Sequence, residues 1–153
     1  MHTIKLYLDH GSIYVDSAPI EVNEKSILIG PIAKPCSPPM HTNQGRTRYR
    51  LLKKTSVCGQ SASCVIEVGD ARKFSVFFLF DFIEFFAFST LESKIIRAFE
   101  KSLKLKFTSN HPNTAFLDSC RWGAAIFSYD ANQGDLSLEI RFGSSENEKK
   151  SNP

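Results

Sequence analysis

Two carboxylates and one thiol stand in surroundings that could support catalysis: Asp81, Glu84 and Cys58. Asp81 and Glu84 interrupt the apolar stretch KFSVFFLFDFIEFFAFSTL, in which phenylalanine predominates. Apolar surroundings disfavour a charged carboxylate and raise its pKa, and a general acid–base pair needs such a raised pKa. Cys58 begins a small, turn-like sequence, Cys-Gly-Gln-Ser, which could expose the thiol. Together these residues define the hypothesis of a hydrolase or transferase.

The same carboxylates also fit a structural role. Asp81 followed by Glu84 is typical of a helix start, and residues 89–92 (STLE) form a second capping box. The chain contains no GxSxG, GxGxxG or Walker A motif, and its four histidines have no zinc-ligand spacing. We therefore predict no metal and no cofactor, and we favour a protein that is not an enzyme.

The cysteines have neither the spacing of a CxxC redox pair nor that of a zinc knuckle; they are Cys36, Cys58, Cys64 and Cys120. No charged segment followed by an apolar one marks a secretory signal. We therefore expect a cytoplasmic protein with free thiols. A disulfide between Cys58 and Cys64 across a hairpin is the alternative in an oxidising compartment.

The strongest surface feature is a basic strand, which we define as residues 46–54. It carries five cations and one aromatic residue: Arg46, Arg48, Tyr49, Arg50, Lys53 and Lys54. On a strand the three arginines share one face at intervals of roughly 6.5–7 Å, close to the phosphate spacing of a nucleic-acid strand. Tyr49 lies on the other face and could stack on a base only by turning to the arginine side.

Three roles suit this basic strand. Arginine is favoured where a protein docks an acidic partner, and the same face could bind nucleic acid. Positive charge also guards a solvated edge strand against pairing with another sheet. Residues 46–73 carry a net charge near +5, against +3 for the whole chain, so the charge is concentrated in this part of the sequence.

Alternating patterns predict an α+β fold in one domain, residues 1–143, followed by a disordered polar tail, residues 144–153. Antiparallel hairpins at about residues 3–16, 46–80 and 120–142 form the sheet. An amphipathic helix at about residues 90–104 packs on one face of the sheet.

Several finer expectations concern the connections. Residues 74–80 are apolar on both faces, which predicts a central strand covered on both sides. Residues 57–63 read as a turn-rich connection, and residues 81–88 as strand or as the first turns of the helix, with strand favoured. Residues 30–45 hold four prolines and read as a surface loop that could take part in binding.

These features favour a small cytoplasmic binding protein that occludes or stabilises a protein partner, for example a bacterial toxin-neutralising immunity protein or an adaptor. A nucleic-acid-binding protein is the first alternative, and a hydrolase or transferase is the second. A membrane span is not expected, because each of the two carboxylates in the apolar stretch would cost roughly 2.5–3.5 kcal/mol at the bilayer centre. The sequence leaves the partner and any homo-oligomer open.

Overall fold

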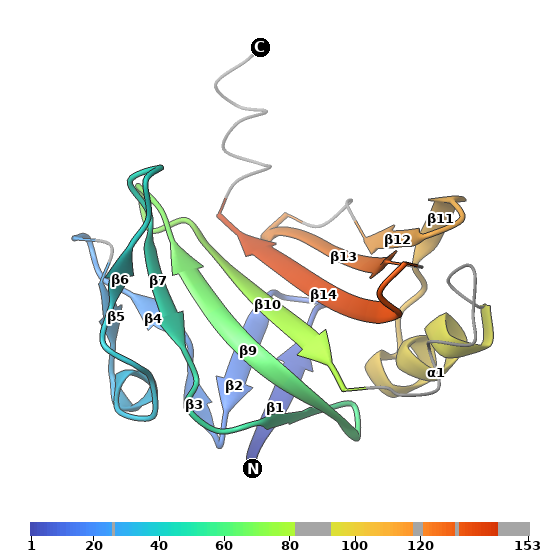
Figure 1. Ribbon diagram of the computed structural model, residues 1–153, viewed down its shortest axis with the longest axis horizontal. Helices are drawn as coiled ribbons and strands as arrows, with labels where there is room; N and C mark the ends of the chain where they lie inside the picture. Colours follow the sequence, from blue (N-terminus) through green and yellow to red (C-terminus); the bar gives the residue numbers. More distant parts are fainter. Residues whose placement is uncertain (26, 82–92, 118–120, 131, 144–153) are drawn as a thin grey trace.

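The protein is mainly β-sheet with one α-helix among the described residues (Figure 1). The computed structural model describes residues 1–25, 27–81, 93–117, 121–130 and 132–143. In chain order the elements are β1 (His2–Tyr7), β2 (Ser12–Val15), β3 (Ala18–Pro19), β4 (Glu21–Val22), β5 (Leu28–Ile29), the 3-10 helix η1 (Pro31–Ala33), β6 (Met40–His41), β7 (Thr47–Arg50), β8 (Thr55–Val57), β9 (Gln60–Val68), β10 (Phe74–Phe80), α1 (Ser93–Leu103), β11 (Thr108–His111), β12 (Thr114–Leu117), β13 (Gly123–Asp130) and β14 (Asp135–Phe142).

Twelve of the described strands form one mixed sheet. Its main path runs β11-β12-β13-β14-β10-β9-β8-β1-β2-β3, and β7 joins β9 and carries β6. Strand β1 pairs in parallel with β8, with His2 opposite Thr55, so the sheet is not built of hairpins alone as expected. The α+β description therefore holds only coarsely. The parallel pair brings β1 and β2 behind β9 and β10, as Figure 1 shows.

The three hairpin regions are present. Strands β1 and β2 pair antiparallel, as do β9 and β10, and β13 and β14. In β14 the residues Leu136, Leu138, Ile140 and Phe142 are buried, as their alternation with polar residues predicted. The hairpins therefore follow from the period-two pattern of apolar residues.

The expected turn-rich connection at residues 57–63 is wrong. Only Cys58 and Gly59 form the loop between β8 and β9, with φ angles of 52° and 79°, and Val57 pairs with Gln60. Two positive φ angles in a two-residue loop suit the twist of a hairpin. The residues that follow, Ser-Ala-Ser, alternate too weakly in hydrophobicity to reveal the strand.

The two faces of the sheet differ in burial. We call the buried side the core face and the other side the open face. In β10 Phe78 is fully buried on the core face, whereas Leu79 on the open face is 46% exposed. Strand β10 is central, between β9 and β14, but the expectation that both of its sides are covered is wrong at Leu79.

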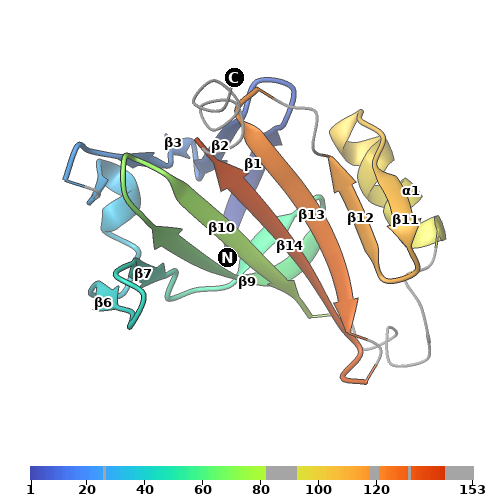
Figure 2. The same cartoon turned by 90° about the horizontal axis from the view of Figure 1, so that it is seen from above.

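Helix α1 packs on the core face at one end of the sheet, beside β11 and β12 (Figure 2). Phe99 is its buried anchor, with ring centroids 5.1 Å from Phe80 and 4.8 Å from Phe127. The predicted helix at about residues 90–104 is present as Ser93–Leu103. Its predicted first turn, the interpretation of residues 82–88 and the tail after residue 143 lie outside the described residues.

The proline-rich loop, residues 30–45, covers the outer edge of β7. The amide of Ser37 donates to the carbonyl of Arg50 at 2.8 Å, and the amide of Leu52 donates to the carbonyl of Pro35 at 3.2 Å. Prolines lack the amide donor that would let another strand add beyond this loop. The loop therefore protects the outer edge of the sheet. The sequence alone did not predict this structural role.

Trp122 fastens the first hairpin to the start of β13. Its indole Nε1 donates to the carbonyl of Leu8 at 2.8 Å, and its ring lies 5.2 Å from that of Phe142. Gly11 has a φ of +73°, and a Cβ there would lie 2.3 Å from the indole. Only glycine fits under the ring at this position.

We predict that Gly11→Ala lowers the free energy of unfolding by more than Gly59→Ala does. Both substitutions place alanine at a positive φ, which costs roughly 1–2 kcal/mol. Gly59 has open space around its Cα, so only Gly11→Ala also displaces Trp122, at an extra cost of about 1–3 kcal/mol. Urea unfolding of the two variants measures the difference, and equal losses would show that the Trp122 contact contributes nothing.

Candidate binding face

Strand register places charged and apolar side chains in rows across the open face. Arg48 lies opposite Glu67, which lies opposite Ser75, which lies opposite Arg141. One step along the strands the next row begins at Arg50 and continues with Val65, Phe77 and Glu139. The face is therefore charged at one end and apolar in its middle.

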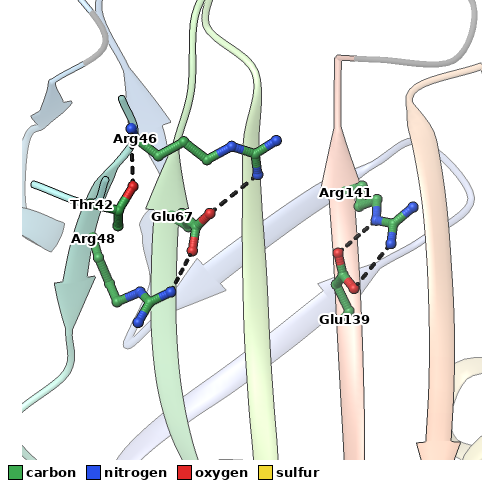
Figure 3. A network of polar contacts seen from close by, with 6 residues as sticks. All are labelled: Thr42, Arg46, Arg48, Glu67, Glu139 and Arg141. Atoms are coloured by element: carbon green, nitrogen blue, oxygen red, sulfur yellow. Dashed lines mark hydrogen bonds and ion pairs between the residues drawn. The ribbon is translucent and has the colours of Figure 1, made fainter. Parts of the chain in front are cut away.

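Glu67 is the centre of the charged end (Figure 3). Its carboxylate accepts hydrogen bonds from Arg46 Nη1 at 3.1 Å and from Arg48 Nη2 at 2.9 Å. The Glu67 side chain is 10% exposed, whereas the two arginine side chains are half exposed. A carboxylate is buried at low cost only where cations pair with it. Arg46 and Arg48 of the predicted basic strand therefore stabilise the fold by neutralising the buried carboxylate of Glu67.

On the neighbouring strand β14, Arg141 pairs with Glu139 through two hydrogen bonds, Nε to Oε2 at 2.6 Å and Nη2 to Oε1 at 3.3 Å. The carboxylate raises the pKa of the Arg141 guanidinium, mainly through these hydrogen bonds. A polar groove of about 630 Å³ runs between the two charged groups. We define the polar groove by Arg46, Glu67, Lys73, Ser75, Glu139 and Arg141.

Lys54 is held at the other end of the basic strand. Its Nζ donates to Asp81 Oδ1 at 2.9 Å and to Ser63 Oγ at 3.0 Å, while Ser61 donates to Asp81 Oδ2 at 2.9 Å. The hydrogen bond from Lys54, helped by that from Ser61, lowers the pKa of Asp81. A general acid needs a raised pKa, so Asp81 does not have the property on which the carboxylate hypothesis rests. Glu84 lies outside the described residues.

Cys58 is a poor nucleophile in this structure. Burial raises the pKa of its thiol, although a hydrogen bond with Ser102 opposes the shift, so the reactive thiolate is scarce at neutral pH. Cys36, Cys58 and Cys64 are free, so no Cys58–Cys64 disulfide is present. Burial also raises the pKa of Cys36 to about 11. Cys120 lies outside the described residues.

Tyr49 does not share the arginine face. It points into the core, where it is 5% exposed, and its hydroxyl accepts a hydrogen bond from the amide of Leu28 at 3.4 Å. Its position opposite to Arg48 and Arg50 follows the alternation of the strand. Its ring is therefore not available to stack on a base or to contact a partner.

The remaining cations of the basic strand, Arg50 and Lys53, are exposed, and neither has an ion pair within the described part of the chain. They border a second groove of about 560 Å³ on the open face, lined mainly by apolar atoms. We define this apolar groove by Arg50, Leu52, Lys53, Val65, Phe77 and Leu79. Leu52 is 69% exposed and Leu79 is 46% exposed, which is unusual for large apolar side chains.

Sequence reasoning found the basic strand but missed the partners of its cations. Glu67 interrupts the apolar run Cys-Val-Ile-Glu-Val, and a lone carboxylate in a strand was the available signal for a cation opposite it. In the sequence Leu79 lies among phenylalanines, so no sequence pattern predicted that its side chain is exposed. Within the described residues no group of three or more His, Cys, Asp or Glu could hold a metal, and no helix is long and apolar enough to cross a membrane.

We predict that Asp81→Asn lowers the free energy of unfolding at pH 7, and that this loss becomes smaller as the pH is lowered below about 4. The pKa of Asp81 is lowered in the folded state, so its stabilisation is present above its unfolded pKa of about 4 and is lost as pH falls through the folded value. The side chain is 40% exposed, so we expect a loss of only about 0.2–1 kcal/mol. Urea unfolding across this pH range measures it, with Glu21→Gln as a control on an exposed strand. A loss of unfolding free energy that is as large at low pH as at pH 7 would show that the ionised carboxylate of Asp81 is not its source.

Comparison with known proteins gives no relative from which a role could be transferred. No protein-family model, no curated protein and no solved structure matches this chain. The function must therefore be argued from the side chains of the open face and from their geometry.

Proposed function

We propose that this chain is a small, non-enzymatic cytoplasmic binding protein that occludes or stabilises a protein partner with an acidic surface. Bacterial toxin-neutralising immunity proteins and adaptors act in this way. The observation that carries the proposal is the apolar groove, in which exposed Leu52 and Leu79 lie beside Arg50 and Lys53. Protein interfaces combine apolar anchors with arginine and other charged groups around them.

The chemistry of the groove supports a protein rather than a small molecule. Val65, Phe77 and Leu79 line it from two neighbouring strands, and such an apolar groove on a sheet face suits a protruding side chain of a partner. Arg50 and Lys53 on its border have no ion pair among the described residues; they favour carboxylates and would steer an acidic partner toward the face. Burial of Leu79 and Leu52 by the partner would supply the hydrophobic part of the affinity.

Nucleic-acid binding has weaker support. Arg46 and Arg48 already hold Glu67, and Lys54 already holds Asp81, so their charges are partly neutralised. Tyr49 is buried and offers no stacking surface. An enzyme that uses Asp81 or Cys58 has weaker support still, because their pKa shifts run against the required chemistry.

We predict that the double variant Arg50→Glu, Lys53→Glu loses the partner. In affinity capture from host lysate, the unaltered protein should retain one protein in a stoichiometric amount, with an acidic surface. The double variant should bind that purified protein at least about tenfold more weakly, because like charges would then face each other. The matched control Arg97→Glu, Lys101→Glu makes the same charge change on α1 and should leave the affinity unchanged.

Two results would overturn the proposal: the absence of any stoichiometric protein, or equal binding by the double variant. Fluorescence polarisation with single- and double-stranded oligonucleotides tests the alternative. Salt-dependent binding there, weakened by Arg48→Ala and Arg50→Ala, would assign the face to nucleic acid instead.

A further inference from the structure

We infer that the polar groove is a binding site for an oxyanion, a carboxylate or phosphate group, held between Arg46 and Arg141. The apolar groove takes no part in this site, so the inference does not rest on the proposed function. Arg46, which directly precedes β7, reaches over β9 to β10, and Arg141 stands on β14, the strand next to β10 (Figure 3). Both arginines are among the residues that line the same groove of about 630 Å³, a size typical of small-molecule sites.

The first support is charge. Glu67 is shared by Arg46 and Arg48, so this group of three retains one positive charge. Arg141 is balanced by Glu139, and Lys73 offsets Asp70 among the groove residues. The charged residues that line the groove balance, and the excess of one positive charge comes from Arg48, which lies beside the groove and shares Glu67.

The second support is preorganisation. Glu67 is nine-tenths buried and fixes one nitrogen of each of its two arginines, at 3.1 and 2.9 Å. Glu139 fixes Arg141 through two nitrogens. A guanidinium carries five donors in a planar fork, so each carboxylate occupies only part of the fork of Arg46 or Arg141. Guanidinium groups that are already held in place lose less entropy when they bind a planar oxyanion.

The third support is the floor of the groove. Ser75 lies between Glu67 and Arg141 in the same row of the sheet, and it is half-buried. A hydroxyl at this position can donate a further hydrogen bond to an oxyanion that spans the two arginines. Charge-assisted hydrogen bonds of this kind are the strong ones in such sites.

The test uses the full chain and two probes, inorganic phosphate and glutarate, titrated at constant ionic strength and pH 7. Nitrogen-15 NMR follows the Nε–H signals of the arginine side chains. The signals of Arg46 and Arg141 should shift and saturate with at least one probe, whereas that of Arg97 on α1 should stay in place. Saturation with phosphate alone or with glutarate alone identifies the source of the oxyanion.

Arg46→Gln and Arg141→Gln should each lower the affinity for the bound probe at least about tenfold. Arg97→Gln removes the same charge elsewhere and should leave that affinity unchanged. Signal shifts on the unaltered protein keep the test decisive if a variant fails to fold. Two results would overturn the inference: no saturable shift with either probe, or equal shifts at Arg46, Arg97 and Arg141, which would indicate general screening of charge.

Discussion

Every second residue along β9, β10, β13 and β14 points into the core, and this alternation divides the sheet into two unlike faces. On the core face Ile66, Phe78, Phe127 and Leu138 are fully buried and meet β1, β2 and α1. Strand β10 lies at the centre and pairs with β9 on one side and β14 on the other. Because the large buried side chains pack mainly on the core face, the open face carries charges and exposed apolar side chains, and the candidate sites follow from that division.

Much of the fold could be predicted from local patterns. The alternation in Leu136–Phe142 and the apolar run of β10 predict strands because burial of one face demands a period of two. The parallel pairing of β1 with β8 could not be predicted, since it joins segments about fifty residues apart and leaves no local trace. The first residues of β9 were wrongly predicted as a connection, because they are small and polar and owe their conformation to β8.

The candidate site was predictable in its residue types but not in its pairings. The alternation of the basic strand correctly placed Arg48 and Arg50 opposite to Tyr49. Which cations are neutralised depends on register: Glu67 meets Arg48 because β7 and β9 pair at that step, and Asp81 meets Lys54 across 27 positions of the chain. Register is a tertiary property, so composition alone overstated the charge that the basic strand offers to a partner.

Phe78 and Leu79 are neighbours in β10 on opposite faces, so they test most directly whether the open face serves binding rather than folding. Urea unfolding of Phe78→Ala and Leu79→Ser provides the measurement. The division of the sheet predicts a loss of about 3–5 kcal/mol for Phe78→Ala and less than about 1 kcal/mol for Leu79→Ser. Comparable losses at the two positions would show that Leu79 is needed for the fold, and would contradict an open face that is available to a partner.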